Sequence, residues 1–169
     1  MIWSAAMKKA IFLPLAVASL FGQNLPDIQE KNGLSLKTIQ GYEKWQVAAT
    51  HWRRDKNELR YVLVDPKNEK AFKKGDKLPN GAIIVKIGWS TKPMDSFPDG
   101  LEADKIQRVE YMIKNDKKFV ATGGWGYARF IKNPDGSYKP WGGDANECYA
   151  CHTAVAGKDY LFSVYQKRF

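Results

Sequence analysis

Asn146-Glu147-Cys148-Tyr149-Ala150-Cys151-His152-Thr153 is the stretch around which this chain is organised, because it contains both cysteines and one of the two histidines. Its C-x-x-C-H spacing is the attachment sequence of a c-type haem, in which two thiolates form thioether bonds to the porphyrin and the adjacent histidine binds the iron. On a helix, positions 148, 151 and 152 project from one face. Asp144 with Glu147 predicts the start of such a helix, and Gly157 predicts its end.

Three other chemistries use paired cysteines. A structural disulfide stays open as an alternative. A thioredoxin-type redox pair is typical of a βαβ unit at the start of a domain, whereas this motif lies near the end of a chain with little βαβ pattern. A four-ligand zinc site lacks a second pair of cysteines. The residues therefore favour haem attachment.

The composition fits one domain that can enclose a cofactor. The chain has 169 residues, of which 44% are apolar and 13% aromatic, enough for a sizeable core and a porphyrin lining. The formal charge is +9, and subtracting Lys8 and Lys9 leaves +7. Such a surface either attracts an acidic redox partner or an anionic membrane, or is only solvated. We expect no nucleic-acid partner, because the first residues, described next, predict export.

The first residues are typical of a signal peptide. Lys8 and Lys9 precede an apolar run from Ala10 to Phe21, and small residues follow at which cleavage can occur. The run is too short to span a bilayer comfortably, and no cysteine follows it that would carry a lipid anchor. We therefore predict a cleaved leader over 1–22 and, in a bacterium, a periplasmic protein. An N-terminal arm over 23–40 and a single haem domain over 41–169 complete the predicted organisation.

Alternating apolar and polar residues, together with turn signals, predict a mainly β (α+β) fold. We expect an antiparallel β-sheet domain with a few short helices and a C-terminal haem-binding helix. Long stretches of 3.6-residue periodicity, which helical cytochromes need, are missing. The expected strands are 46–53, 58–65, 82–89, 105–114 and 123–131, the expected short helices are 42–45 and 66–74, and a long loop is expected over 90–104.

Two charged residues fall on strand faces that are otherwise apolar. Lys86 is the only charged residue of 82–89, and Gly88 beside it leaves room for a flat group. A lysine there must be paired, neutral or covalently used, unless it reaches solvent from an edge strand. Arg60 shares a face with Val62 and Val64, where it either pairs with a haem propionate, faces a distal ligand, or forms an ordinary buried salt bridge.

Several segments resemble the cytochrome P460 family and its relatives, the cytochromes c′-β. The likeness covers roughly residue 42 to the C-terminus, and the order of the segments is as informative as any one of them. A further block, Gly123–Phe130, resembles the broad family rather than its best-known hydroxylamine-oxidising members. The matching segments are Leu59–Pro66, Asn80–Lys86, Gly100–Ala103, and Cys148–His152 followed by Asp159–Phe162.

The resemblance implies one haem c, bound covalently through Cys148 and Cys151. His152 is implied as the iron ligand on one side, while the other side of the iron stays open. Lys86 matches the lysine that this family joins covalently to a meso carbon of the haem. Such a bond needs a neutral amine, which burial on an apolar face favours.

The resemblance also implies a reaction and its partners. Hydroxylamine is oxidised to nitrous oxide or nitric oxide at the open iron, and Glu102 is implied as the residue that takes the protons. Arg60 is the second candidate catalytic residue. The implied partners are a small nitrogenous substrate or a gas, and a periplasmic cytochrome that accepts electrons. The chain itself is expected to form a homodimer.

A second function stays open beside the enzyme. A non-catalytic protein of the cytochrome c′-β type would bind nitric oxide or carbon monoxide, or would transfer electrons. A sixth iron ligand would favour electron transfer, and Met94 is the best candidate, ahead of His51 and Met112. Three tryptophans either flank the porphyrin or pack in the core: Trp89, Trp125 and Trp141.

Overall fold

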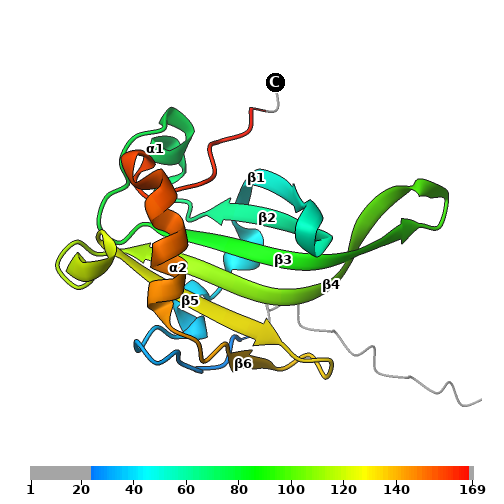
Figure 1. Ribbon diagram of the computed structural model, residues 1–169, viewed down its shortest axis with the longest axis horizontal. Coiled ribbons are helices and arrows are strands. Elements are labelled where there is room, and N and C mark those ends of the chain that lie inside the picture. The colour runs from blue at the N-terminus through cyan, green and yellow to red at the C-terminus, as the bar shows by residue number, and fades with distance from the viewer. Residues whose placement is uncertain (1–23, 168–169) are drawn as a thin grey trace, which may run out of the picture.

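The computed structural model describes residues 24–167, which form a six-stranded antiparallel sheet with a few short helices (Figure 1). Neighbouring strands in the sheet are also neighbours in sequence, in the order β1-β2-β3-β4-β5-β6. The predicted mainly β fold is confirmed. The strands are β1 (Gln46–Arg53), β2 (Glu58–Val64), β3 (Ile83–Met94), β4 (Phe97–Lys114), β5 (Trp125–Lys132) and β6 (Tyr138–Pro140).

The helices are short. Two are α-helices, α1 (Glu69–Lys74) and α2 (Ala145–His152), and five are single 3₁₀ segments. None of the helices within residues 24–167 is long and apolar enough to cross a membrane. The predicted signal peptide, 1–22, lies outside the described residues. The 3₁₀ segments are η1 (Leu36–Ile39), η2 (Tyr42–Lys44), η3 (Arg54–Lys56), η4 (Val120–Thr122) and η5 (Thr153–Lys158).

The two faces of the sheet bury different partners, because side chains alternate along each strand. One face packs Val85, Ile87 and Val109 against the segment that precedes β1, whose Leu36 and Ile39 are fully buried. The described part of the predicted arm therefore covers the core. The opposite face carries Ile84 and Met112 and is covered at one end by α1 and α2 (Figure 1). Its buried members are Ala48, Ala49, Val62, Val64, Phe72, Leu78, Ala82, Ile84, Met112, Trp125 and Tyr127.

The expected loop over 90–104 is wrong. Residues 90–94 continue β3, residues 97–104 begin β4, and the hairpin projects beyond the rest of the sheet (Figure 1). Thr91 pairs with Ala103, and the register shifts at three points along this hairpin. Pro, Gly and Asp, which indicated a loop, are tolerated in this ribbon because each strand has an outer edge that needs no ladder partner. The short strand β6 is a second element that the sequence did not indicate.

Candidate functional site

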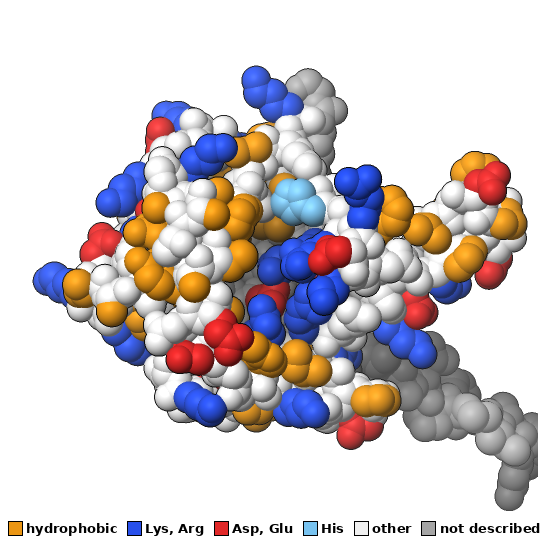
Figure 2. Space-filling model, in the orientation of Figure 1, with side chains coloured by type: hydrophobic (Ala, Val, Ile, Leu, Met, Phe, Trp, Pro, Cys, Tyr) orange, Lys and Arg blue, Asp and Glu red, His pale blue; other side chains and the backbone are white. Residues whose placement is uncertain are grey.

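A cavity of about 570 Å³ lies between α2 and the sheet face that α2 covers. Its size falls within the range of sites that enclose a small molecule or cofactor. In Figure 2 the centre of this face is hollowed, and Lys and Arg side chains gather there beside a histidine. The lining comes from β1 to β5, α2 and the C-terminal tail, and includes Arg60, Val62, Ile84, Lys86, Arg108, Glu110, Met112, Tyr127, Arg129, Trp141, Cys148, Cys151, His152 and Phe162.

Helix α2 presents the C-x-x-C-H motif to this cavity. Asp144 is the N-cap, and its carboxylate accepts a hydrogen bond from the Asn146 backbone N–H at 2.8 Å, so the predicted start is confirmed. The predicted end at Gly157 is wrong, because α2 ends at His152 and the chain continues as η5. Cys148 and Cys151 are both free thiols, the first half-buried and the second exposed.

The imidazole of His152 is held in one orientation. Its Nδ1 lies 2.6 Å from the carbonyl oxygen of Tyr160, so Nδ1–H donates and Nε2 is left to bind a metal. The ring lies between those of Tyr127 and Phe162, with centroids 5.1 and 5.0 Å away. Burial lowers the pKa of His152, although the hydrogen bond to Tyr160 acts in the opposite direction. A neutral imidazole with one free nitrogen is the form that ligates iron.

Glu110 is the centre of a charged cluster opposite this helix. Its carboxylate, in a residue only 8% exposed, forms ion pairs with Lys86 and, at 2.5 Å, with Arg129. Arg108 approaches the same carboxylate at 3.4 Å. Burial alone would raise the pKa of Glu110, but attraction to Lys86 and Arg129 outweighs it and lowers the pKa to about 2. Glu110 is therefore ionised at neutral pH, with Lys86 as its counter-ion.

Glu58 is the second buried acid at the edge of this cavity. It is 1% exposed and forms ion pairs with Arg60 and, at 2.5 Å between Oε2 and Nη2, with Arg108. Gly88, on the neighbouring strand, makes room for this contact, because a Cβ there would lie 3.1 Å from the Glu58 carboxyl carbon. The space that we expected Gly88 to leave for a flat group is therefore taken by the Glu58 carboxylate.

The structure brings together most of the predicted site residues. Arg60, Lys86, Cys148, Cys151 and His152 all line the one cavity. Of the alternatives left open for Lys86, the structure shows an ion pair, because Glu110 lies directly across from it on β4. An ammonium in this half-buried position is thus stabilised by charge, without a covalent bond.

Glu102 and Met94 are not among the cavity residues. Glu102 lies on the projecting β3–β4 hairpin, where it pairs with Lys92 at 2.9 Å and its side chain is 41% exposed. Met94 ends β3 in the same hairpin, beside Phe97. The structure therefore does not bring either residue to His152 within this chain. The other two candidates for a sixth ligand, His51 and Met112, do line the cavity.

The three tryptophans have different surroundings. Trp141 lines the cavity, and the guanidinium of Arg129 lies 4.2 Å from its ring centroid. Trp125 is fully buried in the core, and Trp89 packs on the opposite face of the sheet. Only Trp141 is thus placed to contact a group bound in this cavity.

Four charged residues of the site were missed by the sequence interpretation. Glu110 had a usable signal, because it shares a strand face with Met112 and alternates with Val109 and Tyr111. Its pairing with Lys86 depends on the β3–β4 register, which only the fold defines. The missed residues are Glu58, Arg108, Glu110 and Arg129.

The charge on Glu110 gives a testable dependence of stability on pH. Its folded pKa, about 2, lies below the ordinary value of 4.5, so its contribution is present above pH 4.5 and is lost as the pH falls toward 2. The full shift corresponds to about 3 kcal/mol. For haem-free protein, in which Lys86 keeps its charge, we expect the free energy of unfolding of the unsubstituted chain to exceed that of Glu110→Gln most above pH 4.5, and the gap to shrink toward pH 2. Urea titrations measure the gap, and a constant gap would contradict the assignment. Glu102→Gln is the matched control.

The lining fits a haem. Apolar residues from the sheet and tail supply the walls, and six Lys or Arg side chains face three Glu, an excess that suits an anionic group such as the haem propionates. The buried hydroxyl of Tyr127 has no hydrogen-bond partner within residues 24–167, so a polar group of a bound molecule can reach it. Together with a free thiol pair and an oriented imidazole, this donor set defines a haem-binding protein.

Comparison with known proteins extends this conclusion. A family model described as cytochrome P460 matches residues 39–163, and the chain therefore belongs to the cytochrome P460 family. A search of curated proteins found no match. The resemblance noted from the sequence is confirmed, and the match includes β1 to β6 and α2.

Proposed function

We propose that this protein is a c-type haem enzyme that oxidises hydroxylamine to nitrous oxide or nitric oxide. Cys148 and Cys151 bind the haem covalently, and His152 Nε2 is its protein iron ligand. The observation that carries the proposal is that this motif and the Lys86–Glu110 pair line the same cavity. Membership of the cytochrome P460 family supports the haem.

The haem would supply an iron that binds the substrate nitrogen and accepts its electrons. The protein must then accept protons, and Glu110 is the acid that the cavity offers for this step. A carboxylate with a pKa of about 2 is a weak base. Loss of the positive charge on Lys86 would remove the attraction that lowers this pKa, and Glu110 would become a better base. The charge on Lys86 would thus determine how readily Glu110 accepts a proton.

Two arginines of the cavity are placed to bind anionic groups. Arg60 and Arg108 are held by Glu58, which is almost fully buried, so their free N–H groups can bind anionic groups of the haem or its ligand. Arg60 forms the buried salt bridge that the sequence left open as one alternative, and we propose it as a catalytic residue beside the haem. Glu102 remains a candidate proton acceptor only if, in a homodimer, the hairpin of one copy reaches the cavity of the other.

The direct test is turnover by the purified protein. We expect ferric protein to oxidise hydroxylamine with an artificial electron acceptor, with nitrous oxide or nitric oxide measured as the product. The ferric spectrum should be largely high-spin, because Met94 is held away in the hairpin and cannot complete the coordination. A low-spin spectrum that persists in Met94→Ala and turns high-spin in Met112→Ala or His51→Ala would contradict an open iron.

The optical spectrum tests whether Lys86 is bonded to the haem. If its Nζ is bonded to the haem, the conjugation of the ring is interrupted and the Soret band of wild type lies far to the red of an ordinary c-type haem. Lys86→Ala should restore an ordinary spectrum while the thioether bonds stay intact. Lys92→Ala is the matched control, because Lys92 pairs with Glu102 in the hairpin, away from the cavity. A wild-type spectrum identical to that of Lys86→Ala would contradict the link.

One observation favours a second function. Lys86 forms an ion pair with Glu110, a contact that occupies the side chain without a bond to the haem. The cytochromes c′-β lack the lysine link and bind nitric oxide or carbon monoxide instead. Uptake of carbon monoxide by ferrous protein, combined with no oxidation of hydroxylamine, would support this alternative.

The proposal includes a location and partners. The leader over 1–22 would direct the chain to the periplasm, where a cytochrome would accept its electrons and two copies would form a homodimer. Haem stain in the osmotic-shock fraction tests the location. Sedimentation equilibrium of the purified protein tests the dimer.

A further inference from the structure

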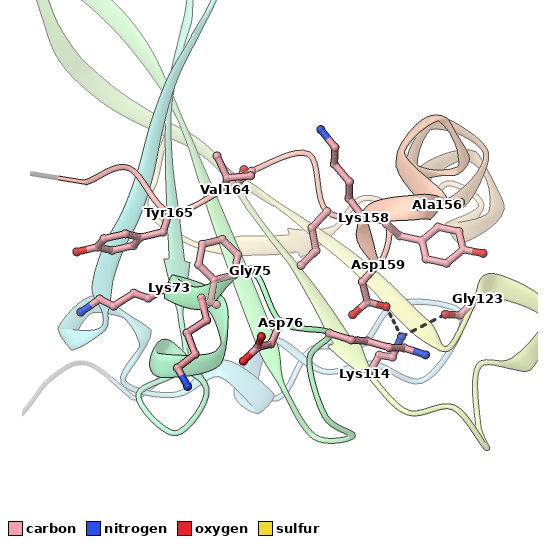
Figure 3. Close-up of a pocket in the computed structure, with 17 residues that line it drawn as sticks. Lys73, Gly75, Asp76, Lys114, Gly123, Ala156, Lys158, Asp159, Val164 and Tyr165 are labelled. Atoms are coloured by element: carbon pink, nitrogen blue, oxygen red, sulfur yellow. Dashed lines mark hydrogen bonds and ion pairs between the residues drawn. The ribbon is translucent and has the colours of Figure 1, made fainter.

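A fully buried lysine lies outside the charged cluster. Lys114, the last residue of β4, is 1% exposed. Its Nζ donates to Asp159 Oδ1 at 2.7 Å and to the Gly123 carbonyl at 3.4 Å, as Figure 3 shows. Asp116 is a more distant and more exposed acid, at 3.5 Å. Because a buried ammonium is costly without a partner, Asp159 is the residue that makes this position of Lys114 tenable.

The carboxylate of Asp159 also joins two other parts of the chain. Oδ2 accepts from the Leu78 backbone N–H at 3.2 Å, and Oδ1 accepts from Trp125 Nε1 at 3.4 Å. The acid is therefore bonded to the segment before β3, to the end of β4 and to the start of β5. Three separate contacts fix its place relative to the sheet.

Asp159 begins a turn of unusual backbone conformation. Asp159 and Tyr160 are consecutive non-glycine residues with positive φ, 52° and 61°. Such conformations are unfavourable and persist where surrounding contacts impose them. Gly123 is required opposite the turn, because a Cβ there would lie 2.3 Å from the Tyr160 ring. The turn is thus held by the Asp159 carboxylate on one side and by close packing of Tyr160 on the other.

The carbonyl of this same turn orients the candidate iron ligand. Tyr160 O accepts from His152 Nδ1 at 2.6 Å, one residue after the acid that fixes the turn. We propose that Asp159, held by Lys114, is a positioning residue for His152: it sets the Tyr160 carbonyl and thereby the orientation and donor strength of the imidazole. This inference rests on iron ligation by His152, and does not require that hydroxylamine be the substrate.

The expected consequence follows from the chemistry of metal-bound imidazoles. A hydrogen bond from Nδ1–H to a carbonyl raises the basicity of Nε2 and fixes the ring. A more basic ligand strengthens the iron–histidine bond and favours ferric over ferrous iron. Releasing the turn should therefore weaken that bond and raise the reduction potential.

The test uses holo-protein variants at this pair. We expect Asp159→Ala and Lys114→Met to lower the iron–histidine stretching frequency in resonance Raman spectra of ferrous protein and to raise the reduction potential. Asp159→Asn should shift both less, because an amide still accepts from Leu78 N–H and tolerates positive φ; it also serves if Asp159→Ala does not fold. The matched control, Asp116→Ala, removes the outer acid from the same lysine and should change neither quantity.

Two further outcomes are decisive. Folded Asp159→Asn and Lys114→Met proteins with the wild-type frequency and potential would overturn the positioning role. A wild type without any iron–histidine band would instead overturn ligation by His152, and with it the proposed function.

Discussion

Replacing both cysteines, as Cys148→Ala with Cys151→Ala, should abolish the pigment that stays with the polypeptide. The two thiols are the only cysteines of the chain, and α2 directs both toward the cavity that contains His152. Thioether bonds survive denaturation, whereas coordination through His152 alone does not. We therefore expect haem stain to remain with wild type after denaturing electrophoresis and to be absent from the double variant.

The control for this result is a cavity variant that leaves the motif intact. His51 lines the cavity from β1 and is not part of α2, so His51→Ala should keep its stain. If acid-acetone extracts the pigment from wild type, the haem is not bound through thioethers. The cysteines would then need another explanation, and the alternative of a disulfide or redox pair would return.

Glu110→Gln should slow hydroxylamine oxidation by about 10²- to 10⁴-fold, the usual cost of removing one general base. Glu110 is the buried acid nearest to Lys86, and its carboxylate also binds Arg129. The amide cannot accept the substrate protons. Stopped-flow measurement with an artificial oxidant gives the rate, and the pyridine haemochrome gives the haem content, which we expect to be unchanged.

Glu102→Gln is the matched control for Glu110. It removes the same charge from the hairpin, where only Lys92 is affected, so the rate should stay within a few-fold of wild type. The reverse pattern, with a slow Glu102→Gln and a normal Glu110→Gln, would return the proton acceptor to the residue that the sequence indicated. Because the amide leaves the half-buried Lys86 and Arg129 without their carboxylate partner, Glu110→Asp is a second test, and we expect it to recover part of the rate.

The sequence predicted the elements whose signals are local. The spacing of Cys148, Cys151 and His152 predicts one helical face, and α2 presents that face to the cavity. Period-two alternation in β3 predicts that Val85 and Lys86 point to opposite faces, as they do. These predictions succeed because a few consecutive residues contain all the information that they need.

The sequence failed where the answer depends on pairing between distant strands. The hairpin over 90–104 has loop-like composition, and only its partner strand makes it a ribbon. The Lys86–Glu110 pair spans β3 and β4, so no local pattern identifies it. Glu102 matched a family segment by its neighbours in sequence, but its strand directs it along the hairpin rather than into the cavity. The strand register, which long-range contacts define, places Glu110 in the cavity and Glu102 in the hairpin.

The most direct test of the proposed site is the mass of the haem peptide from digested wild-type protein. We expect one porphyrin joined to two peptides, one containing Cys148 and Cys151 and the other containing Lys86. Digestion of Lys86→Ala should release the first peptide alone with its porphyrin. If wild type also yields only the peptide with Cys148 and Cys151, the lysine is unlinked, and the gas-binding function replaces the enzyme. If the porphyrin is found on neither peptide, the assignment of the cavity as a c-type haem site is contradicted.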